Sequence, residues 1–249
     1  MSFVSLRADP ISMALHSLLA IVIPVYNETA TIRTVVSEWT EALAKLQIDH
    51  QFILLNDGST DTTLGVLREL EASAPAQIVV VDKPNAGHGR TCRLGYDAAV
   101  ASPAVEWILQ IDSDGQCDPS YFEMFWSKRE NADCIFGKRV KRDDGFARTI
   151  TSKLCKLGAS VLCGRSLEDP NVPYRLLRRP ILDKVLQRIP SSFNIHNVAL
   201  TYVLKKTPGI RWEFVPIRFR ERQGGNNSIN LLNVTHWGLD MLLELRKLK

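Results

Sequence analysis

The chain has 249 residues, of which 45% are hydrophobic and 23% charged, as in an ordinary globular protein. That length supplies one sizeable core, or a domain with an appended subdomain. No run reaches the roughly 18 uncharged apolar residues of a spanning helix, and His16 and Ser17 interrupt the only stretch resembling a signal peptide. The net charge of +4 is mild and comes without a helix-turn-helix, zinc module or RNA-binding signature. We therefore expect no nucleic-acid partner.

Cysteines and basic residues give two further expectations. The five cysteines are an odd number, and their spacing fits neither a zinc site nor a disulfide framework. Free thiols in a reducing cytoplasm are expected, with Cys92, Cys117 and Cys134 as packing residues. Basic residues concentrate in the C-terminal half, where Arg218, Arg220 and Arg222 crowd together. Such clusters suit anionic ligands or an acidic lipid surface.

The first half of the chain alternates predicted strands and helices. Short apolar runs at 20–25, 51–55, 78–81 and 107–111 predict strands, and helical patterns occupy 32–46, the stretch after 56–61, and 91–100. This alternation predicts an α/β fold with a mostly parallel sheet covered by helices on both faces. Ligands of such sheets bind beyond the carboxyl ends of the strands.

The second half has a different pattern. From about residue 137 it shows basic helices, a proline-rich loop at 170–173 and a strand-like segment at 212–219. Without repeats or linkers, we predict a single domain over 1–249, in which 1–118 bind the donor and 119–249 the second substrate. His196 and His236 lack metal-ligand spacing and are predicted on helix surfaces.

The most informative motif is Asp112-Ser113-Asp114-Gly115-Gln116, directly after the strand at 107–111. Mg²⁺ and Mn²⁺ take oxygen ligands, and Mg²⁺ is usually held by one or two carboxylates plus substrate phosphate oxygens. Asp112 and Asp114 therefore predict a metal site for a nucleotide diphosphate. A solvated turn after a strand is the alternative.

A glycine-rich loop, Gly87-His88-Gly89-Arg90, invites a dinucleotide-binding interpretation. That fingerprint fails, because Cys92 stands at its third glycine. The glycines allow a close backbone approach to a ligand. Two interpretations of His88 and Arg90 remain open: contact with donor phosphates, or a purely structural turn.

Four motifs together carry a family resemblance: 23–28 (Ile-Pro-Val-Tyr-Asn-Glu), 56–61 (Asn-Asp-Gly-Ser-Thr-Asp), 85–89 (Asn-Ala-Gly-His-Gly) and 110–116 (Gln-Ile-Asp-Ser-Asp-Gly-Gln). The chain resembles a family 2 glycosyltransferase of the GT-A fold, and within that family the polyprenyl-phosphate sugar transferases of the dolichol-phosphate mannose synthase type. The resemblance implies an inverting, metal-dependent enzyme whose donor is a nucleoside diphosphate sugar, linked to UDP or GDP. Asn56 departs from the pattern, because many members carry aspartate there.

The resemblance also implies roles for individual residues. It implies that the nucleotide is bound by Pro24, Tyr26, Glu28, Asp57 and Asp112, and that Arg222 closes over the diphosphate. Asp57 alternatively serves as a structural helix cap. Asp114 and Gln116 would ligate Mg²⁺ or Mn²⁺ directly, and Asp112 would bond the ribose or add a third ligand.

The sequence leaves more than one interpretation of the acceptor open. For a polyprenyl phosphate, already an anion at neutral pH, the candidates to hold the phosphate are Arg139, Arg148 and Arg175. A hydroxyl acceptor must lose a proton, and Asp169 would then be the base. Pro173 stands where the subfamily usually has glycine. A silent nucleotide-sugar binding module is the rival from another class, whereas a nucleotidyltransferase would need a Gly-x-Gly-x-Arg signal that the chain lacks.

An expectation of membrane association rests on two amphipathic, basic segments, at 146–161 and 231–245. Each fits either the membrane interface or ordinary packing against the sheet. In a chain that resembles lipid-phosphate transferases, the pair favours peripheral association with the cytoplasmic face of a membrane.

Overall fold

The computed structural model describes residues 18–140, 169–193, 196–221 and 248. Within those ranges the chain forms a single seven-stranded sheet. Its strands are β1 (Leu19–Val25), β2 (His50–Asp57), β3 (Ile78–Lys83), β4 (Trp107–Gln110), β5 (Cys134–Arg139), β6 (Arg175–Arg178) and β7 (Trp212–Ile217). The helices are α1 (Ile32–Lys45), α2 (Thr63–Ser73), α3 (His88–Ala101), α4 (Phe122–Ser127), α6 (Arg179–Leu186) and α7 (His196–Lys206), with 3-10 turns η1 (Pro119–Tyr121) and η2 (Lys128–Glu130).

The strands follow the order β3-β2-β1-β4-β6-β5-β7 across the sheet. Strands β1 to β4 pair in parallel, and β5 pairs in parallel with β7. Among the described strands, β6 alone runs the other way, antiparallel to both β4 and β5. The carboxyl ends of the other strands therefore meet the amino end of β6 at one edge of the sheet.

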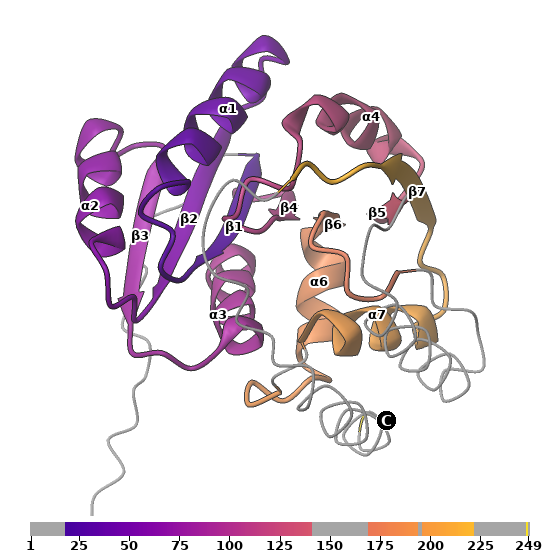
Figure 1. The fold of residues 1–249 in the computed structure, drawn as a ribbon. Coiled ribbons are helices and arrows are strands. Elements are labelled where there is room, and N and C mark those ends of the chain that lie inside the picture. The colour runs from indigo at the N-terminus through magenta and orange to yellow at the C-terminus, as the bar shows by residue number, and fades with distance from the viewer. Residues whose placement is uncertain (1–17, 141–168, 194–195, 222–247, 249) are drawn as a thin grey trace, which may run out of the picture.

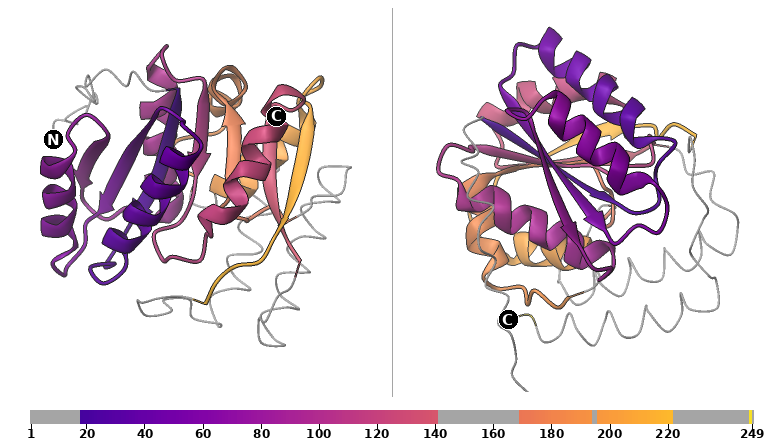
Figure 2. Two further views of the ribbon diagram at one scale, coloured as in Figure 1. Left: turned by 90° about the horizontal axis from the view of Figure 1, so that it is seen from above. Right: turned by 90° about the vertical axis from the view of Figure 1, so that its left-hand side faces the viewer.

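Helices cover the sheet on both faces, as Figures 1 and 2 show. Helices α1 and α2 pack together on one face, while α3, α6 and α7 contact one another on the opposite face. Every residue of β1 and β2 is buried, as expected for central strands with helices on both sides. The predicted α/β class with a mostly parallel sheet is confirmed.

Helix α3 approaches the sheet closely because it carries Gly95 at the contact. A Cβ at this position would lie 2.4 Å from Val22 Cγ1 and 2.9 Å from Leu55 Cδ1. Because glycine has no side chain, the helix can pack closely against β1 and β2. This close approach helps to place the amino end of α3 at the edge where the strands end.

The predicted elements of the first half agree with the structure to within a few residues, with one functional difference. The third helix begins at His88 instead of Thr91, so part of the expected glycine-rich loop is the first turn of α3. Strands β5 and β6 were not predicted. The amphipathic segments at 146–161 and 231–245 lie outside the described residues.

Two further expectations concern single residue types, and a third concerns membrane-spanning helices. Cys92, Cys117 and Cys134 are buried and unpaired, which confirms them as packing residues. The surface position predicted for His196 is wrong: it is only 1% exposed, with its ring 5.5 Å from that of Tyr96. Helix α7 is buried from His196 to Leu204, so it has no solvent face there. Burial lowers the pKa of His196 to about 3. Among the described residues, no helix has the length and apolar character to cross a bilayer.

Candidate active site

The predicted site residues gather at the edge where the parallel strands end. Strand β1 leads into Tyr26, β2 ends at Asp57 and β4 leads into Asp112. Strand β5 ends at Arg139, and the reversed strand β6 starts there at Arg175, in register with Gln110. Residues far apart in sequence are thus brought to one edge, the usual ligand position in open α/β sheets.

The motif after β1 combines two buried residues with one exposed aromatic ring. Pro24 is buried within β1, opposite Leu55 of β2. Glu28 is also buried, and its carboxylate accepts a hydrogen bond of 2.6 Å from the Thr31 hydroxyl. Tyr26 is 46% exposed, and among the described residues only Met124 and Val140 are likewise large, hydrophobic and exposed. Of the three motif residues, Tyr26 offers a free surface on which a planar base can stack.

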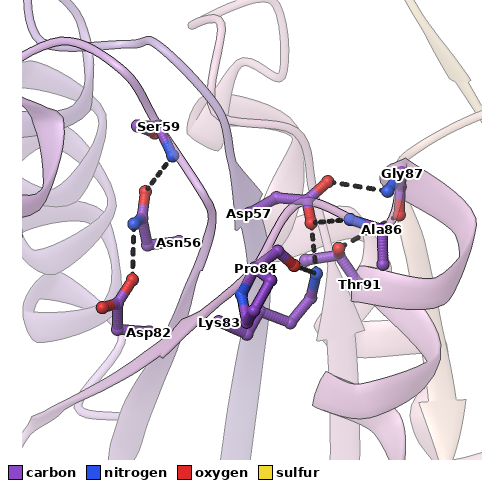
Figure 3. A network of polar contacts seen from close by, with 9 residues as sticks. All are labelled: Asn56, Asp57, Ser59, Asp82, Lys83, Pro84, Ala86, Gly87 and Thr91. Carbon is purple, nitrogen blue, oxygen red and sulfur yellow. Dashed lines mark hydrogen bonds and ion pairs between the residues drawn. The ribbon is translucent and has the colours of Figure 1, made fainter.

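Asp57 is bound by donors of its own chain, as Figure 3 shows. Its Oδ1 forms an ion pair with Lys83 and accepts a 2.8 Å hydrogen bond from the Ala86 N–H. Its Oδ2 accepts a 3.0 Å bond from the Gly87 N–H, immediately before α3. The carboxylate therefore sits at a helix amino end, where backbone donors stabilise negative charge. With a side chain only 5% exposed, Asp57 holds the glycine-rich segment against the end of β2.

Asn56, at a position where many members of the family that the chain resembles carry aspartate, points away from Asp57 and bonds a second carboxylate (Figure 3). Its Nδ2 donates to Asp82 Oδ1 at 2.7 Å, and its Oδ1 accepts from the Ser59 N–H at 3.3 Å. An aspartate at position 56 would face Asp82 with like charge. The substitution thus fits its neighbour on β3, with which it is in register.

The carboxylates of Asp112 and Asp114 follow β4 and are both partly exposed. Asp112 Oδ1 accepts a 3.1 Å bond from the Gln110 side chain, and Asp114 Oδ1 accepts a 3.1 Å bond from the Gln116 N–H. Burial raises the pKa of Asp112; the neighbouring His88 opposes this rise, and Asp114 adds to it. Two acidic groups that repel each other in this way favour a cation between them.

His88 joins the glycine-rich motif to the Asp112–Gln116 motif. Its Nε2 lies 3.7 Å from Asp112 Oδ1 and 3.5 Å from the Cys92 sulfur. The Cys92 sulfur raises the pKa of His88 most, and the Asp112 carboxylate raises it further. Arg90, the other residue left open by the sequence, donates instead to the Ser192 carbonyl at 3.3 Å. Between the two, His88 is the residue beside the carboxylates.

Arg139 and Asp169 form a two-pronged ion pair at the end of β5. Nε of Arg139 donates to Oδ2 of Asp169 at 2.6 Å, and Nη2 donates to Oδ1 at 2.5 Å. Asp169 has a φ of +38°, a left-handed conformation that aspartate tolerates better than most residues. The residue predicted to hold an acceptor phosphate and the residue predicted as a base are therefore direct partners.

Arg175 is fully buried, at 0% exposure. Its guanidinium donates to the carbonyls of Pro170, Val172 and Asn197 at 2.6 to 2.8 Å and lies 4.8 Å over the Phe136 ring. Burial lowers the pKa of Arg175. A phosphate would reach this guanidinium only if several of these bonds opened. In the described structure, Arg175 ties the 170–172 loop to α7.

Two predicted residues, Arg148 and Arg222, lie outside the described residues. Sequence reasoning also missed residues that the site contains. Lys83 is the ion-pair partner of Asp57, and Asp82 is the partner of Asn56. Their position at the end of β3, just before Pro84, was the available signal. Arg220 contacts Gln116, and from the sequence it was assigned only to a basic cluster.

The donor set fits a divalent cation that shares its coordination with a substrate. Among the described residues, no group of three or more His, Cys, Asp or Glu side chains could hold a metal ion. Two carboxylates and the Gln116 amide oxygen are hard ligands on one short loop. Substrate diphosphate oxygens would complete such a coordination shell, which is the usual arrangement for Mg²⁺.

The fold and the residues at its edge define a glycosyltransferase of the GT-A class. Three-dimensional neighbours share the architecture at low identity. One is glucosyl-3-phosphoglycerate synthase from Mycobacterium tuberculosis, solved with Mn²⁺, UDP and phosphoglyceric acid (TM-score 0.65, 18% identity, covering 92% of this chain and 78% of that one). Another is mannosyl-3-phosphoglycerate synthase from Rubrobacter xylanophilus (TM-score 0.62, 16% identity, covering 93% and 74%).

Residues 20–190 match the model of glycosyl transferase family 2, and the chain belongs to that family. Among curated relatives, an undecaprenyl-phosphate 4-deoxy-4-formamido-L-arabinose transferase from Proteus mirabilis is 24% identical over 225 residues, covering 90% of this chain and 66% of that protein. The counterpart from Salmonella choleraesuis gives the same values. The chain thus spans just under two thirds of the length of these relatives.

Proposed function

We propose that this glycosyltransferase moves a sugar from a UDP- or GDP-linked donor to a polyprenyl phosphate, with Mg²⁺ or Mn²⁺ bound. One observation carries the proposal: Asp112 and Asp114 share a sheet edge with Tyr26 and with the Arg139–Asp169 pair. A loop with two carboxylates, an exposed aromatic ring and a guanidinium of the kind that binds phosphate thus occur together. The curated relatives are named as undecaprenyl-phosphate sugar transferases, which supports this acceptor class.

On the donor side, Tyr26 stacks on the base, while Asp57 keeps the glycine-rich segment at the end of β2. Asp114 and Gln116 would hold the cation, with Asp112 beside them. The cation would neutralise negative charge on the departing nucleoside diphosphate. We assign residues 1–118 to the donor half on this basis, and residues 119–249 to the acceptor half.

On the acceptor side, a phosphate oxygen is already ionised at neutral pH. It attacks the anomeric carbon from the face opposite the leaving diphosphate, so that the anomeric configuration inverts. No strong base is needed, and catalysis comes from positioning and charge stabilisation. Arg139 is the described arginine whose planar fork suits the incoming phosphate. Association with the cytoplasmic face of a membrane remains part of the proposal.

A hydroxyl acceptor is the second candidate, and the position of Asp169 favours it. The carboxylate is held by two hydrogen bonds from Arg139, just before the amino end of β6. A hydroxyl group must lose its proton during transfer, and Asp169 would accept it. The two candidates therefore differ in how strongly turnover depends on this carboxylate.

The test is release of nucleoside diphosphate from a panel of UDP- and GDP-sugars with Mn²⁺ or Mg²⁺, with and without dispersed polyprenyl phosphate. Metal-dependent release that requires the lipid supports the proposal. Asp114→Ala should abolish it, whereas Asp97→Asn, which alters a carboxylate paired with Arg93 on α3, should not. Full activity of Asp114→Ala would refute the metal site, and release indifferent to lipid would favour the hydroxyl acceptor.

A further inference from the structure

The segment after β7 returns to the metal motif and contacts it through Arg220. The Arg220 N–H donates to the Gln116 carbonyl at 3.1 Å, and the Gln116 side-chain Nε2 donates to the Arg220 carbonyl at 3.3 Å. Residues 104 positions apart are thus joined by two reciprocal bonds. Gln116 is held through both its backbone and its side chain.

The Arg220 side chain fixes this contact to two other elements. Nη1 donates to Glu38 Oε2 of α1 at 2.5 Å, and Nη2 donates to Asp118 Oδ1 at 2.8 Å. The same Asp118 oxygen accepts the Ser120 N–H at 2.8 Å and so caps η1. One guanidinium therefore bridges α1 and the loop that follows the metal motif.

The consequence for Gln116 lies in the orientation of its amide. An amide NH₂ group only donates hydrogen bonds, whereas the amide oxygen only accepts them. Because Nε2 is engaged by the Arg220 carbonyl, Oε1 is the end that remains for a ligand. Hard divalent cations bind oxygen, so the contact selects the amide orientation that a metal site requires.

We propose that Arg220 is a positioning residue, which orients Gln116 so that Oε1 faces the divalent cation. This inference rests on the proposed function, because it assumes a cation at Asp112 and Asp114. Arg220 itself touches neither cation nor substrate in this scheme. Its positive charge is paired with Glu38 and Asp118, which hold the side chain between α1 and the loop before η1.

The test measures Mn²⁺ binding directly, by electron paramagnetic resonance of free Mn²⁺ during titration of the full chain with UDP present. Loss of such outer contacts to metal ligands typically weakens metal affinity about 10- to 100-fold. We expect Arg220→Gln to raise the Mn²⁺ dissociation constant about tenfold, Arg220→Lys to lie between it and the wild type, and Gln116→Ala to match or exceed it. Arg33→Gln, which removes an exposed ion pair between α1 and Glu69 of α2, should change nothing.

Two further variants control for the case in which Arg220→Gln does not fold. Glu38→Gln and Asp118→Asn each remove one anchor, and together they should reproduce the loss while thermal unfolding shows a folded protein. If Gln116→Ala weakens Mn²⁺ binding but a folded Arg220→Gln does not, the inference is wrong and the proposed function stands. If the wild type shows no Mn²⁺ site that depends on Gln116, the assigned metal role and this inference both fail.

Discussion

Arg139 and Asp169 satisfy each other through two parallel hydrogen bonds at the edge of the sheet, although 30 residues separate them in sequence. A phosphate acceptor would compete with Asp169 for the same guanidinium donors. A hydroxyl acceptor would instead use the carboxylate itself. The pair is therefore the place where the two proposed acceptor classes make different demands.

The variant Asp169→Asn distinguishes a phosphate acceptor from a hydroxyl acceptor. The variant keeps the shape of the side chain but removes its charge and its capacity to take a proton. With a polyprenyl phosphate acceptor, we expect kcat to fall by no more than about tenfold, since the acceptor needs no base. With a hydroxyl acceptor, kcat should fall by about 10² to 10⁴. Steady-state kinetics with saturating donor measures the difference, and Asp97→Asn provides a distant carboxylate control.

Arg175→Met tests whether this arginine is structural. The substitution removes the guanidinium donors of the Pro170, Val172 and Asn197 carbonyls in a buried site, and the Thr201 hydroxyl contacts only the Pro170 and Asn197 oxygens. An unsatisfied buried acceptor costs on the order of 1–3 kcal/mol, so we expect a loss of about 1–3 kcal/mol in the free energy of unfolding, chiefly from the Val172 carbonyl. Urea denaturation measures it. Arg33→Met should change the value by no more than about 0.5 kcal/mol, and an equally small effect of Arg175→Met would contradict the structural role.

Gly95→Ala and Gly65→Ala form a matched pair of helix substitutions. A Cβ at Gly95 would overlap Val22 and Leu55, whereas nothing lies within 4 Å of one at Gly65 of α2. Overpacking costs about 1–3 kcal/mol, and replacing an unstrained helical glycine by alanine gains about 0.5–1 kcal/mol. We therefore expect the midpoint temperature of thermal unfolding to fall for Gly95→Ala and to rise for Gly65→Ala. Equal shifts would show that α3 does not depend on the close approach.

The pH dependence of stability should contain a contribution from Asp133. Hydrogen bonds from Arg211, at 2.8 Å to Oδ1 and 3.2 Å to Oδ2, are the main cause that lowers the pKa of Asp133 below its ordinary value of 3.8. A lowered pKa in the folded state means that the carboxylate stabilises the fold above pH 3.8 and that this contribution is lost as pH falls further.

Asp133→Asn should therefore be less stable than the wild type by about 2 kcal/mol near neutral pH. The difference should shrink as the pH falls below about 4. Urea denaturation between neutral pH and pH 3 follows both proteins. Glu213→Gln removes an exposed pair with Lys128 and should cost less than about 1 kcal/mol at neutral pH. A difference that is constant with pH would contradict the role assigned to Asp133.

The first half of the chain was predictable because its strands are short apolar runs that end in turn residues. Side-chain pattern and turn chemistry fix such elements locally. The same logic placed Asp57 and Asp112 at the strand ends. It did not reveal that Lys83 pairs with Asp57, because that contact depends on the register of β2 and β3.

The second half was harder to predict for a physical reason. Strand β6 consists of Arg-Leu-Leu-Arg, and its first arginine is buried only because loop carbonyls from residues 170 and 172 surround it. A charged residue normally indicates the surface. His196 was misplaced for a related reason: α7 is covered by neighbouring elements along its length, which no local pattern records.

The reversed direction of β6 has a consequence for how the enzyme can diversify. Because β6 runs against its neighbours, the loop that enters it, instead of the loop that leaves it, arrives at the substrate edge. Residues 169–174 therefore reach that edge without altering the connections of β1 to β4. On the proposed division into donor and acceptor halves, insertions or sequence changes there should alter acceptor preference while donor recognition stays intact, so the two specificities can evolve separately.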